Sequence, residues 1–160
     1  MERVRKRGAK PCAQIDFGKL REFHLERDWS NQSAAEEEIA FENLVFIVRN
    51  YLQRGYEHII VEDLKDFRVQ QMAEVFADAK PRIVTLVLRD GAELRRRIAQ
   101  RNEGWTNADG AVEINREILE RGEMVGERKI DVSGKTPGQV AQEAMRVLEK
   151  RLGQIPRSSR

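Results

Sequence analysis

Two runs of mostly β-branched apolar residues, at 59–61 and 83–88, dominate the hydropathy pattern of this chain and form the centres of the segments 57–62 and 82–88. Runs of β-branched residues without a polar alternation are typical of parallel strands that helices cover on both faces. We therefore predict a strand at each run, buried on both sides. The first run ends in two adjacent carboxylates, Glu62 and Asp63. Ligands of parallel sheets bind outside the carboxyl ends of the strands, so these acids lie where chemistry is expected.

Helical spacing and two shorter strands fill the rest of the chain. A short strand is expected at 9–17, where it includes Asp16, and another at 129–132. Helices are predicted at 19–26, 33–52, 68–79, about 91–101, about 111–121 and 137–152. The resulting order, β-α-β-α-β-α-α-β-α, predicts one three-layer α/β domain over residues 1–152 with a mostly parallel sheet. The tail at 153–160 has the composition of a disordered end.

Several helix boundaries carry recognisable end signals. Ser33 and Glu36 have the spacing of a capping box, and Gly55 is placed to end the same helix as a C-cap. Thr136 followed by Pro137 is a typical start for the last helix. Asp90 can cap the helix that follows the second long strand.

The first helix has a less regular pattern. Gly18 permits a turn after the first strand, and the helix at 19–26 is expected to bury Leu20, Phe23 and Leu25. The long helix after it carries a clear apolar face. That face comprises Ile39, Ala40, Leu44, Ile47, Val48, Tyr51 and Leu52.

Composition restricts the class of protein. Charged residues make up 35% of the 160 residues, yet the formal net charge is only +2, which gives no general bias toward polyanions. Five basic residues between Arg3 and Lys10 could contact nucleic acid, but a solvated helix end explains them equally well. No apolar run approaches the about 20 residues that span a bilayer. The single Cys12 excludes an internal disulfide and fits a reducing cytoplasm.

Three carboxylates form the first candidate site. Asp16 ends one predicted strand while Glu62 and Asp63 end another, so all three are expected at the same edge of a parallel sheet. Such acids can hold Mg²⁺ through water and orient a substrate hydroxyl. Alternatively, they cap the turns or helices that follow.

An arginine cluster forms the second candidate site. Arg97 and Arg101 are four residues apart, so on one helix they would share a face and could clamp phosphate oxygens. The alternative is a solvated face in which the arginines pair with Glu93 or Glu103. His24 and His58 have no further ligand at metal-binding spacing, and we interpret neither as a metal ligand.

The segment Ser133-Gly134-Lys135-Thr136 imitates a phosphate-binding loop. A true loop needs a glycine five positions before the Gly-Lys pair, and position 129 is Lys129. Pro137 also removes one of the N–H groups that a helix start would offer to a phosphate. A tight turn into a capped helix explains these residues.

The order of elements resembles the P-loop small-molecule kinases of the shikimate kinase, gluconate kinase and chloramphenicol phosphotransferase type. Ile15 to Phe17 is similar to the substrate-binding strand end, and Gly55 to Asp63 resembles the strand with a Walker-B-like acid. Leu94 to Arg101 resembles the arginine-bearing lid, whose helices would span about 91–121. Ile130 to Pro137 is similar to the last strand and the adenine-side loop. The likeness covers roughly residues 9–152, and its signal is the order of these segments.

This resemblance implies ATP- and Mg²⁺-dependent phosphorylation of a small hydroxyl-bearing molecule. By carry-over, Asp16 would bind or deprotonate the acceptor hydroxyl, and Asp63, or else Glu62, would orient Mg²⁺ through water. Arg97 and Arg101 would close over the transferred phosphate. Ser133, Gly134, Lys135 and Thr136 would border the adenine.

The family's first strand and its glycine-rich loop have no counterpart here. Residues 1–8 resemble the end of the helix that follows that loop, and the strand before it would lie between those at 57–62 and 82–88. We expect a longer natural product, a sheet closed differently, or a second chain in the gap; as written, the chain should bind ATP weakly or not at all. The rival hypotheses are a non-catalytic relict that binds a partner or forms a homodimer through its open sheet and, less favoured, a nucleic-acid-binding domain.

Overall fold

The computed structural model describes residues 12–25, 34–101 and 106–152, and its chain forms two compact units, residues 1–76 and 77–160. Both are α/β units built on a pair of parallel strands. The mixed α/β class with parallel strands is therefore confirmed, although the described strands form two small sheets rather than one. The prediction of a single domain over residues 1–152 stays a prediction. The Ser33 cap and both chain ends lie outside the described residues.

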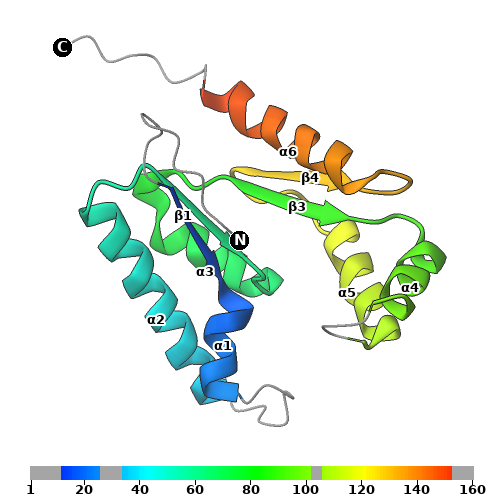
Figure 1. Cartoon of the computed structure of the whole chain (residues 1–160), viewed down its shortest axis with the longest axis horizontal. Coiled ribbons are helices and arrows are strands. Elements are labelled where there is room, and N and C mark those ends of the chain that lie inside the picture. Colours follow the sequence, from blue (N-terminus) through cyan, green and yellow to red (C-terminus); the bar gives the residue numbers. More distant parts are fainter. Residues whose placement is uncertain (1–11, 26–33, 102–105, 153–160) are drawn as a thin grey trace. The chain divides into compact units, whose positions relative to one another are not determined.

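The first unit packs three helices around two strands (Figure 1). Its elements are β1 (Cys12–Asp16), α1 (Phe17–Leu25), α2 (Ala34–Gln53), β2 (His58–Glu62) and α3 (Asp66–Val75). Strands β1 and β2 run parallel, with Asp16 opposite Glu62 at their carboxyl ends. Helix α2 ends as predicted, since Gly55 has a positive φ of 77° and donates its N–H to Leu52 O at 3.0 Å.

The core of this unit lies on one side of the sheet. Its buried members are Phe17, Ala40, Phe41, Leu44, Val48 and Phe76. Ile59 and Val61 pack against this core, but Ile60 between them faces the other side and is 53% exposed. The predicted burial of this strand on both faces is therefore wrong. The described helices cover only the face that bears Ile59 and Val61.

Helix α1 differs from its prediction in two respects. It begins at Phe17, so Gly18 lies within the helix rather than in a turn. Phe23 is 85% exposed instead of buried, and Phe17 fills the core in its place. Phe17 meets Phe41 edge to face, with ring centroids 6.3 Å apart. The early helix start directs this ring inward, and Leu20 packs against the core as predicted, while the Leu25 side chain lies outside the described part of the chain.

The second unit pairs β3 (Ile83–Val87) with β4 (Glu127–Asp131), again in parallel. Its helical elements are the short 3₁₀ helix η1 (Ala77–Ala79), α4 (Gly91–Ala99), α5 (Ala108–Glu120) and α6 (Pro137–Leu152). Asp90 caps α4 by accepting from the N–H groups of Ala92 and Glu93, as predicted. The buried apolar residues are Val87, Leu88, Ile98 and Ile130. Leu86, in the middle of β3, is 54% exposed.

A buried carboxylate ties β3 and β4 to the turn before β4. Glu127 is only 1% exposed and receives hydrogen bonds from Thr85 Oγ1, from the Met124 N–H and from both terminal nitrogens of Arg121. Burial raises the pKa of Glu127, but these hydrogen bonds and the charge of Arg121 outweigh it and lower the pKa to about 2. The carboxylate therefore stays ionised, as a buried charge does when it is fully hydrogen-bonded.

Two side chains fix α5 against the strands of this unit. Asn115 pairs with both backbone groups of Leu88, donating to its carbonyl at 2.7 Å and accepting from its N–H at 3.0 Å. Lys129 of β4 donates its ammonium group to the carbonyls of Ile118 and Arg121. The two Lys129 contacts satisfy carbonyls at the C-terminal end of α5, which have no partner within the helix.

Candidate functional site

The carboxyl ends of β1 and β2 bring two predicted acids against one glycine. A Cβ atom built on Gly18 would lie 2.2 Å from Asp63 Oδ2 and 3.1 Å from Asp16 Oδ1. The Asp63 carboxylate thus occupies the space that any larger residue at position 18 would need. This close approach explains a glycine inside a helix, where it costs about 1 kcal/mol relative to alanine.

Asp63 is held in an unusual backbone conformation. Its φ is +61°, in the left-handed region that non-glycine residues adopt only at a cost of about 1–2 kcal/mol. This conformation follows directly on the end of β2 at Glu62. Residues held in this way are concentrated at functional sites.

The electrostatics of this edge favour proton chemistry at Asp63. Burial raises the pKa of the Asp63 carboxyl, the negative charges of Asp16 and Glu62 raise it further, and the charge of Arg21 lowers it in part. Asp63 therefore binds a proton more readily than an ordinary aspartate does, and the neighbouring Asp16 carboxylate is the group left to interact with a bound hydroxyl. The same pair could hold Mg²⁺ through water.

The predicted capping alternative for Asp16 is also present. Asp16 Oδ1 accepts from the Lys19 N–H at 3.2 Å, so this residue supports the first turn of α1. Glu62 Oε1 accepts from Gln14 Nε2 at 2.8 Å. Over the described ranges, no group of three or more His, Cys, Asp and Glu side chains has an arrangement that could hold a metal ion. Binding of Mg²⁺ by Asp63 or Glu62 therefore stays a prediction.

Pattern reasoning missed a buried cluster of charges in the same unit. The Arg68 side chain lies between two aromatic rings, with its guanidinium carbon 4.5 Å from the Phe41 centroid and 4.8 Å from that of Phe67. It is only 3% exposed and donates to Glu38 Oε2 at 2.8 Å. One signal was available in the sequence: Arg68 precedes the inward-facing Met72 by four residues, which places both on one helix face.

The second unit brings together two residues that the resemblance assigns to the nucleotide, Arg97 at the transferred phosphate and Lys135 at the adenine. Arg97 of α4 and Lys135 of the loop before α6 line one cavity of about 520 Å³. The rest of its wall is apolar and comprises Val84, Leu86, Val132, Pro137, Val140, Ala141 and Ala144. Arg97 donates to Glu93 Oε1 through Nε and Nη2, at 3.0 and 2.5 Å, and Nη2 also reaches Val132 O at 3.3 Å.

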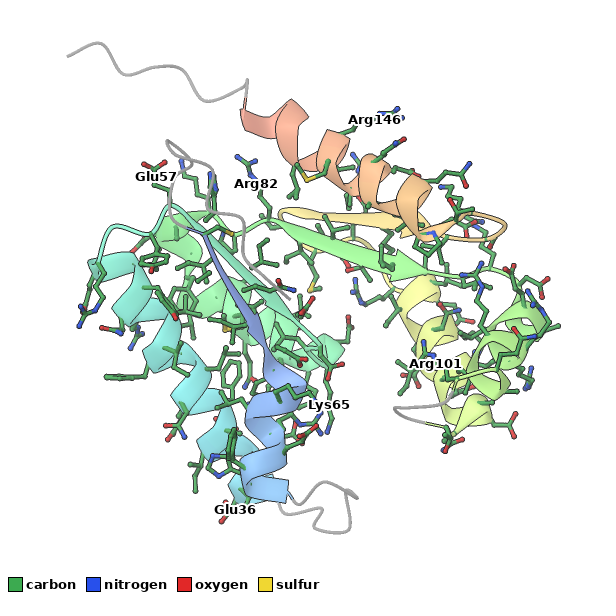
Figure 2. All side chains as sticks on the ribbon, viewed as in Figure 1. Glu36, Glu57, Lys65, Arg82, Arg101 and Arg146 are labelled. Atoms are coloured by element: carbon green, nitrogen blue, oxygen red, sulfur yellow. The ribbon has the colours of Figure 1, made fainter. Side chains whose placement is uncertain are left out.

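Arg101 does not join Arg97 as predicted. Helix α4 ends at Ala99, so the two arginines do not share a helix face, and Arg101 follows the end of α4 (Figure 2). Arg101 is exposed and does not line the cavity. The spacing argument fails because it assumed two more residues of helix. The alternative of pairing with Glu93 is what Arg97 shows.

The segment Ser133 to Thr136 forms a turn and a helix cap. Ser133 Oγ donates to Asp131 Oδ1 at 2.6 Å, and Gly134 has a positive φ of 66°. Thr136 Oγ1 accepts from the Gln139 N–H at 3.4 Å, while Gln139 Oε1 accepts from the Thr136 N–H at 2.8 Å. This reciprocal cap starts α6 at Pro137. The tight-turn interpretation is confirmed, and the adenine-side role stays a prediction.

Comparisons with known proteins give no match: no family model, no curated protein and no solved structure resembles the chain significantly. Among the helices of the described residues, none is both long enough and apolar enough to cross a membrane. Its function is therefore inferred from the residues of the two sites themselves.

Proposed function

We propose that this chain is part of an ATP-dependent phosphotransferase that acts on a small hydroxyl-bearing molecule. The observation that carries the proposal is the approach of Asp16 and Asp63 to Gly18 at the carboxyl ends of β1 and β2. In this proposal Asp16 binds or deprotonates the acceptor hydroxyl, and Asp63, with Glu62 as the other candidate, orients Mg²⁺ through water.

The second unit is assigned the nucleotide side of the reaction. Arg97 would neutralise charge on the transferred phosphate, and the turn from Ser133 to Thr136 would border the adenine. The chemistry also requires backbone N–H groups and a lysine around the phosphates. No glycine-rich loop of this kind is present in the 160 residues, so the proposal needs that element from outside them.

A phosphoryl-transfer assay tests this proposal. Protein isolated from its natural source is incubated with γ-labelled ATP, Mg²⁺ and a set of small polyols and hydroxylated metabolites. We expect a labelled small molecule, and Asp16→Asn should reduce its formation by about 100-fold or more. Glu22→Gln is the matched control, since it removes one carboxylate from α1 at an ion pair with Lys19. Transfer at the wild-type rate in Asp16→Asn would remove Asp16 from the mechanism.

A second candidate function is assembly through the strands. Apolar side chains in the middle of β2 and β3, Ile60 and Leu86, are more than half exposed. An apolar sheet face that is left exposed can be covered by another chain. Light scattering after size-exclusion chromatography would show a mass that rises with protein concentration, and Leu86→Lys should abolish that rise. A monomeric mass at all concentrations would exclude self-assembly.

A further inference from the structure

Each cation that lines the cavity of the second unit is held by one carboxylate. Arg97 binds Glu93 at 2.5 Å, and Lys135 binds Glu143 at 2.5 Å. All four side chains are at least partly exposed, and the two pairs come from different elements, α4 for the first and the loop and start of α6 for the second. The charges around the cavity therefore cancel in this state, although two cations face an apolar wall.

We propose that Glu93 and Glu143 are internal counter-ions, which a polyphosphate must displace to reach Arg97 and Lys135. This inference rests on the proposed phosphotransferase function and concerns its nucleotide side, where it assigns the Lys135 ammonium group to the phosphates rather than to the adenine. A monovalent anion offers each cation no more charge than the carboxylate it already binds. A polyphosphate presents several charges on one molecule and can replace both carboxylates together. The pairs thus select for multiply charged phosphates.

The contacts of Arg97 determine the direction of the expected effect. Its Nη2 atom also donates to the carbonyl oxygen of Val132, so the guanidinium is held at the cavity wall by a second acceptor. Glutamine at position 93 keeps a side-chain oxygen that can accept the same hydrogen bond, but it carries no charge. In Glu93→Gln the positive charge of Arg97 should therefore no longer be neutralised, while its side chain stays at the cavity wall. The same reasoning applies to Glu143→Gln and Lys135.

The test is a titration of the full chain with inorganic tripolyphosphate, followed by NMR through the Arg97 side-chain Nε–H and the Lys135 backbone amide. We expect Glu93→Gln and Glu143→Gln each to bind the probe about two- to fivefold more tightly than wild type, as expected when a partly exposed ion pair no longer competes. Glu113→Gln is the matched control. It makes the same change in net charge at an exposed ion pair with Arg116, away from the cavity lining.

Three results would overturn the inference. They are unchanged or weaker binding in either glutamine variant, an equal gain in Glu113→Gln, or no response of Arg97 and Lys135 to the probe at millimolar concentration in any of these proteins. Thermal unfolding followed by circular dichroism verifies that each variant is folded, and the two variants on separate helices provide independent tests. Because the readout is equilibrium binding, it is distinct from the transfer assay. If no phosphoryl transfer is observed but the glutamine variants bind tripolyphosphate more tightly, the phosphotransferase proposal is rejected while Glu93 and Glu143 are retained as counter-ions.

Discussion

Glu127 should make the stability of the second unit depend on pH in the acid range. Its carboxylate is buried against Arg121, Thr85 and the Met124 N–H, and its native pKa of about 2 lies below the ordinary value of 4.5. A carboxyl with a lowered native pKa stabilises the fold above its unfolded pKa and loses that contribution as the pH falls through the native value. The relevant window is therefore from about pH 5 to about pH 2.

The magnitude follows from the two pKa values. Their difference corresponds to at most about 3 kcal/mol, and with partial solvent screening about 2 kcal/mol is the working expectation. Glu127→Gln removes the charge and leaves Arg121 with a neutral partner. We expect it to lower the free energy of unfolding by about 2–3 kcal/mol at pH 7, because Thr85, Met124 and the partly exposed Arg121 then lose their buried, charged acceptor.

Urea unfolding followed by circular dichroism at pH 7, 5 and 3 measures both effects. The wild-type protein should lose stability between pH 5 and pH 3, and Glu127→Gln should show a flatter dependence over the same interval. Glu113→Gln, at an exposed pair with Arg116, should follow the wild-type curve. Equal stability of Glu127→Gln and wild type at pH 7, or parallel curves below pH 5, would refute the assignment of this carboxylate as a buried structural anion.

Two further variants test the first unit. Alanine in place of glycine normally stabilises a helix by up to about 1 kcal/mol. Gly18→Ala should not show this gain in the free energy of unfolding, because its Cβ would meet Asp63 Oδ2 at 2.2 Å. Gly138→Ala in α6 is the control, since nothing lies within 4 Å of the added carbon, and equal urea midpoints for the two variants would contradict the close approach. Arg68→Met should lower the free energy of unfolding by about 2 kcal/mol, since it removes a buried cation between two aromatic rings together with its ion pair to the half-exposed Glu38. Arg116→Met at an exposed position should stay near wild type, and equal losses in both would show that the burial of Arg68 contributes nothing.

The positions of the helices and strands could be predicted from the sequence better than the burial of their side chains. The strands, most helix ends and the Asp90, Gly55 and Thr136 caps follow from local rules, because caps and turns depend on residues three or four positions apart. Burial depends on what lies across the sheet, and an apolar triplet such as Ile59-Ile60-Val61 has the same composition whether one or both faces are covered. The uncovered Ile60 could not be predicted from the run itself.

The candidate sites were predicted in part for the same reason. Strand ends in a parallel sheet share one edge, so the meeting of Asp16 with Asp63 followed from topology. The pairing of Arg97 with Arg101 required the helix to continue for two more residues, and helix ends vary by one or two residues. Arg68 was missed because an isolated arginine is normally placed in solvent, whereas here two phenylalanines and Glu38 compensate for its burial.

The central claim is that Asp16 and Asp63 form one coupled site at the carboxyl ends of β1 and β2. The most direct test is a carbon-13 NMR titration of the Asp63 carboxyl in the wild-type protein and in Asp16→Asn. We expect the pKa of Asp63 to lie above the ordinary 3.8 in the wild-type protein. In Asp16→Asn the pKa of Asp63 should be lower, because one of the negative charges that raise it has been removed. An Asp63 pKa at its ordinary value, or one that Asp16→Asn leaves unchanged, would contradict the claim.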